Sequence, residues 1–506
     1  MTRKQSKGIS LLLCAILLLT GCSPAVPMRE NSNVTLPPAK AVYQAPEGDE
    51  QRDKVETVLL YLPSASTGQL TPLSMTMALA PNRHPAETAL SRLLSYSGSE
   101  TVRPLLEGQQ LEVYTGSAIE ILGSTATVNL GAGALALDSQ QMLTVCRAIT
   151  NTLTQWNDIR YVNILIASRQ PGIDITATLP MGSLRRTQNE EALWDIPAGD
   201  TRFTSVATLY YPANVGKGVL AEARAVTFAS KTMSDMVMGL LTALSADAPS
   251  LQGLPDVPSL DLLLAERVIV SDSTTGGGRV VSLHFQEAAN EVFINAGIPR
   301  SVMMASIVLT LTTFLPNISG VSVRIGQENV RALVPTGVLE GGGQEILFQD
   351  GIMRRADFTN FLLNMVPLYF DNGEGRLARV QRPLPYYRAQ HVRALFEQLL
   401  GGPEAVEITP GLKNPMPGGI TSADLIGFTV ENDTVLVNLS ENFLQQCQGL
   451  SPQQETLVIY SLVNTFCELR GIRRVRFYVA GQQPETLSGA LYLPGEFLFN
   501  PNIIQQ

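Results

Sequence analysis

The side chains that most often carry acid–base or metal chemistry are few in this sequence and lie far apart. The three histidines are His84, His284 and His391, and none lies in an HExxH or CxxC pattern. A zinc site needs three or four Cys, His or carboxylate ligands at short spacings. His391 lies near the start of a predicted helix, between two arginines, which indicates a solvated helix-face residue. We therefore expect no metal and no cofactor.

Carboxylates are plentiful, and a pair of them is what glycoside hydrolysis requires. The candidates all have structural interpretations, however. Asp433 is predicted in a turn and Glu397 on the polar face of a helix, whereas Asp371 and Glu374 belong to a predicted hairpin. Aromatic residues make up 6% of the chain, with two tryptophans, which is few for a cleft that stacks sugars. A carboxylate pair remains an alternative, and we assign no catalytic residue.

Arg473, Arg474 and Arg476 form a short basic cluster that leads into a predicted strand. Because strand side chains alternate, Val475 and Phe477 should face one side and Arg476 the other. Two interpretations are open. The arginines are either solvated charges on a strand face or a contact surface for an acidic partner. We take these three residues as the candidate partner surface.

The first 22 residues resemble a bacterial lipoprotein signal. Arg3, Lys4 and Lys7 precede an apolar run from 9 to 19, which is too short to span a bilayer comfortably. The run ends in Leu-Thr-Gly-Cys, and in lipoproteins such a cysteine is lipidated and becomes the first mature residue. The resemblance implies that Cys22 carries two or more acyl chains, enough for stable anchoring. The alternative is an ordinary secretory signal with an incidental cysteine.

Residues 23–54 are rich in Pro, Asn, Glu and Ala and show no strand or helix periodicity, which predicts a disordered tether. Fully extended, such a tether reaches about 90 Å at ~3.1 Å per residue. We expect the folded part at the outer face of the cytoplasmic membrane. A formal net charge of −9 without a basic patch argues against nucleic acid as a partner.

Three segments open on Leu-Tyr and have the pattern of a β-hairpin, with apolar residues, a turn and an alternating return strand. They are LYLPSASTGQLTPL from Leu60, LYYPANVGKGVLAEA from Leu209 and LYFDNGEGRLARV from Leu368. Each is followed by an amphipathic helix, an extended pair, a second helix and a strand. The hairpin is therefore the first element of a tandem repeat.

The end of the repeat aligns without gaps. Residues 138–167 lie over 451–480 at an offset of 313, and matched positions include Gln141/Gln454 and Asn151/Asn464. The middle copy keeps the pattern at an offset of 159. The extended pairs of the outer copies close on nearly the same phrase, TVNL and LVNL, whereas the middle copy has RVVSLHF.

The pattern predicts an α/β fold of the two-layer α+β kind, with two helices on one face of a small mixed sheet in each repeat. We expect three tandem domains: repeat 1 (55–186), repeat 2 (201–358) and repeat 3 (365–506). Repeat 2 contains an additional predicted hairpin at 338–351. Each repeat is large enough to hold its own core.

Two further features are predicted to be structural. The apolar segment 302–315 should be a buried helix, because it is too short to span a membrane. Cys146 should be a small buried apolar residue. Cys447 and Cys467 bracket a predicted helix whose ends lie about 22 Å apart. A disulfide between them requires the preceding loop to fold back, and we favour free thiols.

The LYF hairpin with its acidic-Gly turn, LLGGP, TVLVNLS and VRFYVAGQ together resemble the GerM domain of sporulation and spore-germination lipoproteins. Repeat 3 carries all four phrases, repeat 1 carries weaker forms, and repeat 2 is the most divergent. The resemblance implies small α/β modules similar to the ring-building motifs of secretion and sporulation channels.

The resemblance also implies a membrane-anchored, noncatalytic structural or interaction protein of sporulation or germination, located at the cytoplasmic membrane or in the spore envelope. Its expected partners are the membrane, through the lipid, and proteins of the cell envelope, including further copies of itself. One alternative is a peptidoglycan-acting enzyme or enzyme accessory of the spore cortex or cell wall. A solute-binding lipoprotein is less favoured, because such receptors need two lobes around one cleft.

Overall fold

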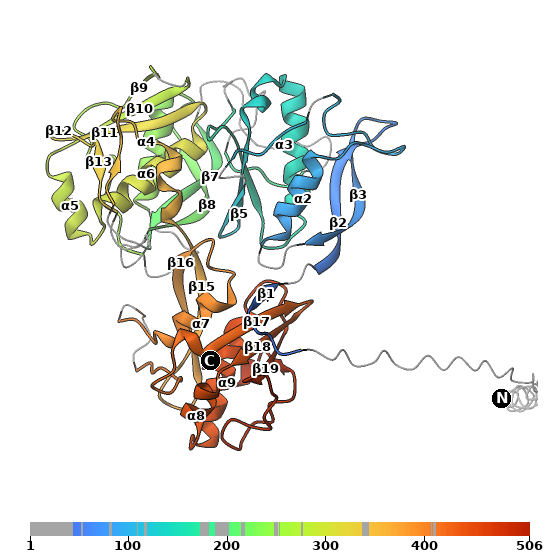
Figure 1. Cartoon of the computed structure of the whole chain (residues 1–506). Coiled ribbons are helices and arrows are strands. Elements are labelled where there is room, and N and C mark those ends of the chain that lie inside the picture. Colours follow the sequence, from blue (N-terminus) through green and yellow to red (C-terminus); the bar gives the residue numbers. More distant parts are fainter. Residues whose placement is uncertain are drawn as a thin grey trace, which may run out of the picture. The chain divides into compact units, whose positions relative to one another are not determined.

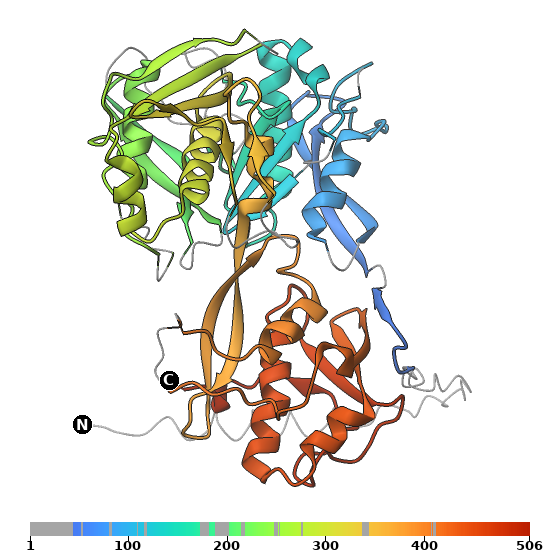
Figure 2. The ribbon, with the colours of Figure 1, turned by 60° about the vertical axis from the view of Figure 1, so that its left-hand side comes forward.

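Figures 1 and 2 show a computed structural model of the 506-residue chain from two sides. It describes residues 44–51, 54–79, 83–108, 110–115, 119–172, 182–187, 202–213, 218–246, 251, 254–274, 277–335, 344–405, 407 and 411–505. Three predictions concern residues outside these ranges: the lipidated Cys22, the tether up to residue 43 and the boundary segment 188–200.

The order of hairpin, helix, hairpin, helix and strand occurs three times (Figure 1). Repeat 1 contains β2 (Lys54–Pro63), β3 (Leu70–Leu79), α2 (Pro85–Leu94), β4 (Ile119–Leu122), β5 (Thr125–Leu130), η1 (Ala132–Ala136), α3 (Ser139–Leu153) and β6 (Tyr161–Ile166). Repeat 2 contains β7 (Phe203–Pro212), β8 (Val219–Phe228), α4 (Met233–Leu244), β9 (Ile269–Asp272), β10 (Arg279–Phe285), α5 (Ala289–Asn295), α6 (Arg300–Phe314), β11 (Ile318–Ile325) and β12 (Glu328–Asn329). Repeat 3 contains β15 (Leu362–Asp371), β16 (Leu377–Pro385), α7 (Val392–Leu400), η4 (Ser422–Asp424), β17 (Leu425–Glu431), β18 (Thr434–Leu439), α8 (Glu441–Cys447), α9 (Pro452–Cys467), β19 (Arg474–Val479), β20 (Phe497–Leu498) and η5 (Pro501–Ile503).

The mixed α/β fold class is confirmed, but each repeat distributes its strands over two sheets instead of one. The opening hairpin β2–β3 is a sheet by itself, and β4, β5 and β6 form a second sheet in which β5 and β6 are parallel. The helices of each repeat pack against both sheets. The hairpins of repeats 2 and 3 join into one sheet of order β16-β15-β8-β7. The helical layer thus buries apolar residues of both sheets at once.

The additional hairpin predicted at 338–351 lies partly outside the described residues, and its second half pairs with a strand that precedes the predicted segment. β13 (Ala332–Leu333) pairs antiparallel with β14 (Ile346–Leu347), and the connecting residues 336–343 lie outside the described ranges.

The aligned glutamines begin the long helices of the outer repeats. The Asp138 side chain accepts the N–H of Gln141, whose side chain accepts the N–H of Asp138, and Ser451 and Gln454 make the same capping box at α9. A capping box satisfies two backbone donors that the first turn of a helix leaves open. The match between the two repeats therefore fixes where both helices start.

The repeated Leu-Tyr phrase has one structural role in all three hairpins. Leu60, Leu209 and Leu368 are fully buried in the cores of their repeats. The backbone of the tyrosine that follows binds a hydroxyl on the long helix of the same repeat. The contacts are Tyr61 N to Thr152 Oγ1 (3.0 Å), Tyr210 N to Thr310 Oγ1 (3.0 Å) and Ser461 Oγ to Tyr369 O (2.6 Å). The helix thereby covers a strand edge that would otherwise expose unpaired backbone groups.

The tyrosine side chains are covered by the segment that follows the last strand of each repeat. The Arg186 guanidinium lies over Tyr61, and the Arg355 guanidinium lies over Tyr210. In repeat 3, Phe499 meets Tyr369 edge-on, with the ring centroids 5.9 Å apart. Position 499 is 313 residues after position 186, so the alignment extends into this tail.

An amide clasp holds the tail in the two outer repeats. Asn151 donates to Thr187 O (3.0 Å) and accepts from Thr187 N (3.2 Å), whereas Asn464 makes the same two bonds with Asn500 at 3.1 and 2.8 Å. A buried amide that pairs both ways with one backbone residue leaves neither group unsatisfied. The sequence match of Asn151 with Asn464 therefore reflects a shared structural bond.

The N-terminal segment departs from the tether prediction, because its last residues are ordered on repeat 3. β1 (Asp49–Gln51) pairs in parallel with residues 428–430 of β17 and extends the sheet to the order β1-β17-β18-β19-β20 (Figures 1 and 2). The predicted tether over 23–54 is therefore too long at its C-terminal end. Composition suggested disorder, but the segment obtains its backbone partners from a strand almost 380 residues away.

The segment between repeats 2 and 3 is packed structure, not a loose linker. Residues 355–361 form a 3-10 helix, η3, and Phe358, Phe361 and Leu362 belong to the core of repeat 2. Strand β15 starts at Leu362, three residues before the predicted start of repeat 3. The predicted boundary differs from the structure because Leu362 has two roles. Its side chain packs in the core of repeat 2, and its backbone begins strand β15 of repeat 3.

Three large hydrophobic clusters correspond to the three repeats. The prediction of a buried helix is confirmed by α6, in which residues 301–314 are all buried. Within the described residues, no single helix is long and apolar enough to cross a membrane, whereas α5 and α6, bent by 105° at their junction, satisfy length and composition only as a pair. Cys146 is buried as predicted, and Cys447 and Cys467 are free thiols.

Candidate functional site

The asparagine in the closing phrase of the second hairpin stabilises the turn after the last strand. Asn129 Oδ1 accepts the N–H of Ser168 (2.9 Å), and Asn438 Oδ1 accepts the N–H of Gly481 (3.1 Å). Both turns have positive φ, with 64° at Ser168 and 82° at Gly481. A side-chain acceptor stabilises a backbone conformation that a serine rarely adopts.

His284 replaces this asparagine in repeat 2. Its Nε2 lies 2.9 Å from the carbonyl oxygen of Gly326, in the corresponding turn. Its Nδ1 lies 2.9 Å from Glu266 and 2.7 Å from an Arg324 nitrogen. The histidine is thus a structural residue. It donates to a carbonyl of the turn, whereas the asparagine of the other repeats accepts a backbone N–H there, so the phrase RVVSLHF keeps the contact with the turn but reverses its direction.

The other two histidines are at helix starts. His84 is the N-cap of α2, where its Nδ1 accepts the N–H of Ala86 (3.0 Å) and its Nε2 lies 3.2 Å from Asp158. Burial and the positive charge of Arg470 lower the pKa of His84 from 6.5 to about 3. His391 is the N-cap residue of α7, half-buried and edge-on to Phe428, so it is less solvated than predicted.

The carboxylates considered for catalysis have the structural positions that were expected. Glu397 accepts from Arg388 at 2.7 Å on α7. Asp433 lies in the turn between β17 and β18, and its carbonyl accepts the N–H of Arg473. A different carboxylate, Glu455, is fully buried and accepts three backbone N–H groups of residues 487, 490 and 491. Sequence reasoning missed Glu455, because it follows a helix start like any exposed glutamate.

The candidate partner surface is only partly available. Val475 and Phe477 are buried and Arg476 points to the opposite face, as predicted. Arg476 pairs with Glu496 at 2.9 Å, and Arg474 lies 3.7 Å from both Glu496 and Asp433. Arg473 is exposed. The three arginines therefore lie together, but a nearby glutamate already balances two of them.

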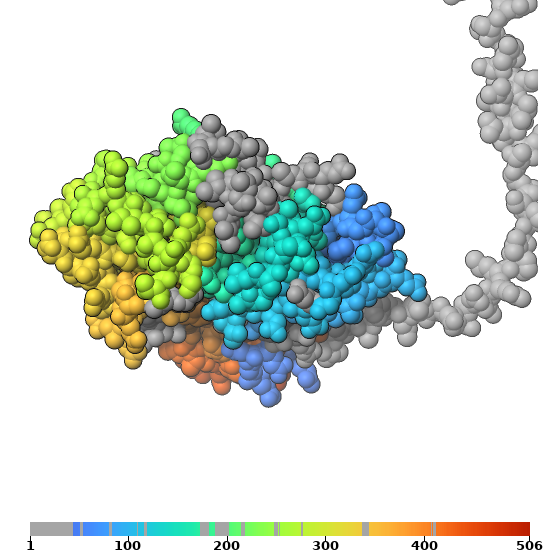
Figure 3. Space-filling model, turned by 90° about the horizontal axis from the view of Figure 1, so that it is seen from above, coloured from blue at the N-terminus to red at the C-terminus, as the bar shows by residue number. Residues whose placement is uncertain are grey.

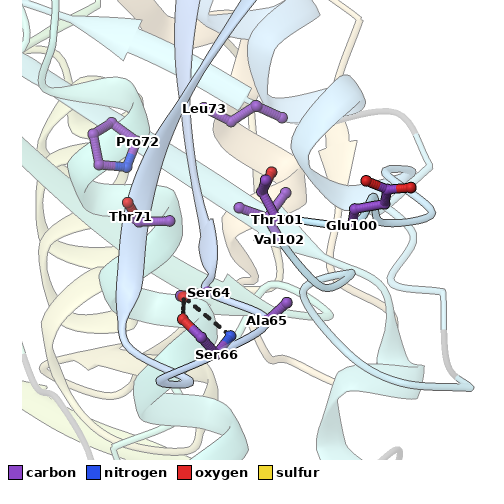
Figure 4. Close-up of a pocket in the computed structure, with 9 residues that line it drawn as sticks. All are labelled: Ser64, Ala65, Ser66, Thr71, Pro72, Leu73, Glu100, Thr101 and Val102. Atoms are coloured by element: carbon purple, nitrogen blue, oxygen red, sulfur yellow. Dashed lines mark hydrogen bonds between the residues drawn. The ribbon is translucent and has the colours of Figure 1, made fainter.

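A hollow of about 670 Å³ lies beside the tip of the first hairpin (Figure 4). Its lining comes from the hairpin turn, the start of β3 and one loop: Ser64, Ala65, Ser66, Thr71, Pro72, Leu73, Glu100, Thr101 and Val102. The hydroxyls of Ser64 and Ser66 bond to each other at 3.0 Å, and Ala65 N donates to Thr101 O at 2.9 Å. No histidine, lysine or cysteine is among these lining residues, and their one ionisable side chain is Glu100.

A buried ion pair connects repeat 1 to the end of repeat 2. Glu120 on β4 and Arg355 on η3 are each 2% exposed and bond directly. Arg355 also donates to Thr313 Oγ1 (2.6 Å) and to the Tyr210 hydroxyl (3.2 Å). Burial alone would lower the pKa of Arg355, but the charge of Glu120 and the contact with Tyr210 raise it above its ordinary value. Sequence spacing gave no signal for this pair, because 235 residues separate its members.

A buried network of amide and hydroxyl groups lies at the same junction. Asn163 Nδ2 donates to Thr127 Oγ1 (3.1 Å) within repeat 1 and to Thr208 Oγ1 (2.9 Å) of repeat 2, and Ser183 completes the network. The atoms of the two repeats adjoin on the face that Figure 3 shows. Paired polar groups in a low-dielectric interior fix one register between two surfaces.

No group of three or more His, Cys, Asp or Glu side chains suited to a metal ion occurs within the part of the chain that the structure describes.

Residues 367–485 match the protein family described as Germane: Sporulation and spore germination. Among solved structures, the tandem GerMN domains of the sporulation protein GerM from Bacillus subtilis are 18% identical, with a TM-score of 0.22, over 60% of this chain and 99% of that one. The first GerMN domain of the same protein is also 18% identical, with a TM-score of 0.20, over 26% and 96%. No curated protein matches the chain. The family match therefore rests on the sequence of residues 367–485, and this part of repeat 3 is similar to the sporulation and spore germination family.

Proposed function

We propose that this protein is a membrane-anchored, extracytoplasmic, noncatalytic scaffold of sporulation or spore germination, held by a lipid on Cys22. The observation that carries the proposal is the family match of repeat 3. The lipobox-like sequence before Cys22 supports the anchor, and the buried contacts between repeats 1 and 2 suit a protein that presents surfaces at fixed spacing.

Protein partners bind, in this proposal, at the basic surface of repeat 3. Reversal of Arg473, Arg474 and Arg476 to Glu would also break the pairs with Glu496, so it would mix partner binding with stability. Arg473→Glu is the cleaner variant, because this side chain is exposed. Arg376→Glu is a matched control, since Arg376 is an exposed residue of the opening hairpin in the same repeat.

The test is recovery of envelope proteins with the full chain from sporulating cells. Arg473→Glu should reduce recovery of an acidic partner by more than the ~5-fold change that a single exposed ion pair of ~1 kcal/mol produces, because the approaching surface is complementary as a whole. Arg376→Glu should leave recovery unchanged. Equal recovery with both variants would contradict the basic surface as the binding site.

Two parallel measurements examine the other parts of the proposal. Cys22→Ser should abolish lipid labelling, and normal labelling of that variant would exclude Cys22 as the anchor. Purified protein should release no products from peptidoglycan. Hydrolysis that disappears when one carboxylate is changed would favour the enzyme alternative.

A further inference from the structure

The segment 44–51, hereafter the strap, occupies the β17 edge of repeat 3. Three parallel residue pairs join it to residues 428–430, from Asp49 with Phe428 to Gln51 with Val430. Pro46 is buried, and its carbonyl accepts from Asn438 Nδ2 at 2.7 Å. Asp49 receives Nε and Nη2 of Arg393 at 2.6 and 2.5 Å. The strap thus binds through an apolar anchor, a backbone ladder and a carboxylate, as extended peptides bind sheet edges.

Gly427 on β17 leaves the space that the backbone of the strap occupies. A Cβ at position 427 would lie 2.5 to 2.7 Å from backbone atoms of Gly48. The φ of Gly427 is not positive, so its conformation suits other residues, and only the approach of the strap requires glycine.

In repeat 3 the Nδ2 group of Asn438 bonds to the strap, whereas the equivalent group of repeat 1 bonds within its own repeat. In repeat 1, Asn129 Nδ2 donates to Ser168 Oγ at 2.9 Å. The equivalent of Ser168 in repeat 3 is Gly481, which has no hydroxyl. Asn438 therefore keeps the turn bond with its Oδ1 and directs its Nδ2 to Pro46. A single sequence difference between two copies of the repeat thus creates a binding group for the strap.

Arg393 is held in place independently of the strap, since its Nη1 donates to the carbonyls of Ser422 (3.3 Å) and Leu425 (3.0 Å). The Asp49–Arg393 pair is about one quarter exposed, at 29% and 27%. The recognition groups therefore belong to the domain, whereas the strap contributes only three residues of ladder, one proline and one carboxylate.

We propose that the β17 edge of repeat 3 is a binding site for extended acidic protein segments, and that the strap occupies this site within the same molecule. The ligand it fits has a buried proline, a glycine two residues later and a carboxylate next to that glycine, as in Pro46-Glu-Gly-Asp49. Another such segment binds only after the strap leaves. The proposal goes beyond the scaffold role, and it requires neither lipidation nor the basic surface.

Hydrogen exchange on the full chain tests whether the strap is bound. Gly427→Ala should raise exchange at residues 47–51 by an order of magnitude or more, because the methyl group displaces Gly48. Gly418→Ala is the matched control, since Gly418 has ordinary φ and no atom within 4 Å of an added Cβ. Equal exchange in both variants, with normal protection elsewhere, would overturn the strap.

Peptide binding tests whether the vacated edge is a site. Asp49→Arg places two positive charges together and expels the strap while leaving Gly427, Asn438 and Arg393 intact. A peptide of residues 44–51, QAPEGDEQ, should bind this variant at least about tenfold more tightly than the wild type, whose strap competes at the high effective concentration of a linked segment. The peptide with Arg in place of its Asp should bind neither protein.

Asp49→Arg combined with Gly427→Ala should lose the peptide, although its own strap is released. The absence of peptide binding to Asp49→Arg, or undiminished binding to the double variant, would overturn the site. A wild-type dimer that disappears in Gly427→Ala would overturn occupation within one molecule and show exchange of the strap between copies.

Discussion

The junction between repeats 1 and 2 differs in kind from the attachments of repeat 3. The first junction is buried. It contains the Glu120–Arg355 pair and the Asn163 network, and Leu122 of repeat 1 packs in the core of repeat 2. Repeat 3 is attached by two parallel residue pairs between β15 and β8, and by a small buried cluster of Ala213, Leu220 and Leu363. Two polar contacts add to these: the Asn364 amide with the backbone at the end of β4, and the partly exposed pair of Arg470 with Asp158. Each repeat has its own hydrophobic cluster, but the larger buried polar contact leads us to expect that repeats 1 and 2 unfold together and that repeat 3 unfolds separately.

The largest expected effect comes from breaking the buried pair at the first junction. Glu120→Ala leaves the Arg355 charge buried without its carboxylate, which costs about 3–5 kcal/mol of unfolding free energy. The loss should appear in the exchange of core amides in repeats 1 and 2 and not in those of repeat 3. An equal loss in all three repeats would contradict independent folding.

Replacing both partners should recover most of that loss, because Glu120→Leu with Arg355→Met leaves no unpaired charge. Glu328→Gln is the control for an ion pair that is exposed instead of buried. It breaks the exposed Arg300–Glu328 pair, whose removal should cost ~1 kcal/mol or less in denaturant unfolding.

A smaller effect should appear on acidification, at the contact between repeats 1 and 3. The folded-state pKa of His84, about 3, lies below its unfolded value of 6.5, so the unfolded chain binds the proton first. The stabilisation is complete above pH 6.5 and is lost as pH falls towards 3. Between pH 6.5 and 5 the unfolding free energy should fall by about 1.5 kcal/mol, from ~1.4 kcal/mol per unit of pKa difference.

The measurement is denaturant unfolding across this pH range, with His84→Gln as the comparison. The glutamine variant should lack this part of the pH dependence, and Arg470→Gln should reduce it, because the charge of Arg470 helps to lower the pKa. An NMR titration that gives His84 a pKa near 6.5 would contradict the burial of this histidine.

The smallest effects are expected at the residues first considered for chemistry. His391→Gln, Glu397→Gln and Asp433→Asn alter a cap, an ion pair and a turn of repeat 3. Each should change the unfolding free energy by roughly 0.5 kcal/mol or less, as is usual for substitutions outside a core. A loss of partner recovery tenfold or greater in any of them, at unchanged stability, would locate a functional site that the repeat architecture does not explain.

The sequence predicted the elements where one repeat could be compared with another. The offset of 313 matched Gln141 with Gln454 and Asn151 with Asn464, and the structure shows the same capping box and the same amide clasp at these matched positions. The role of His284 escaped notice because histidine and asparagine look unrelated, although both bind a turn backbone. That histidine and asparagine are equivalent here becomes visible only in the structure, where both contact the same turn.

Contacts between distant residues could not be predicted in this way. Glu120 and Arg355 occur in local contexts that favour an ordinary strand and an ordinary turn, and neither shows that its partner lies 235 residues away. The strap carries Pro, Gly and Glu, which indicate disorder in an isolated chain. Its order depends on Gly427 and Asn438, near the other end of the sequence.

The strap has a mechanical consequence for a chain held at its N-terminus, as proposed for Cys22. Tension applied there would reach β1, and therefore β17 of repeat 3, before it reaches β2 of repeat 1. The buried Pro46 and the Arg393 ion pair would bear that load first. The strap, which three residue pairs hold on β17, would then detach before the buried junction of repeats 1 and 2 is strained.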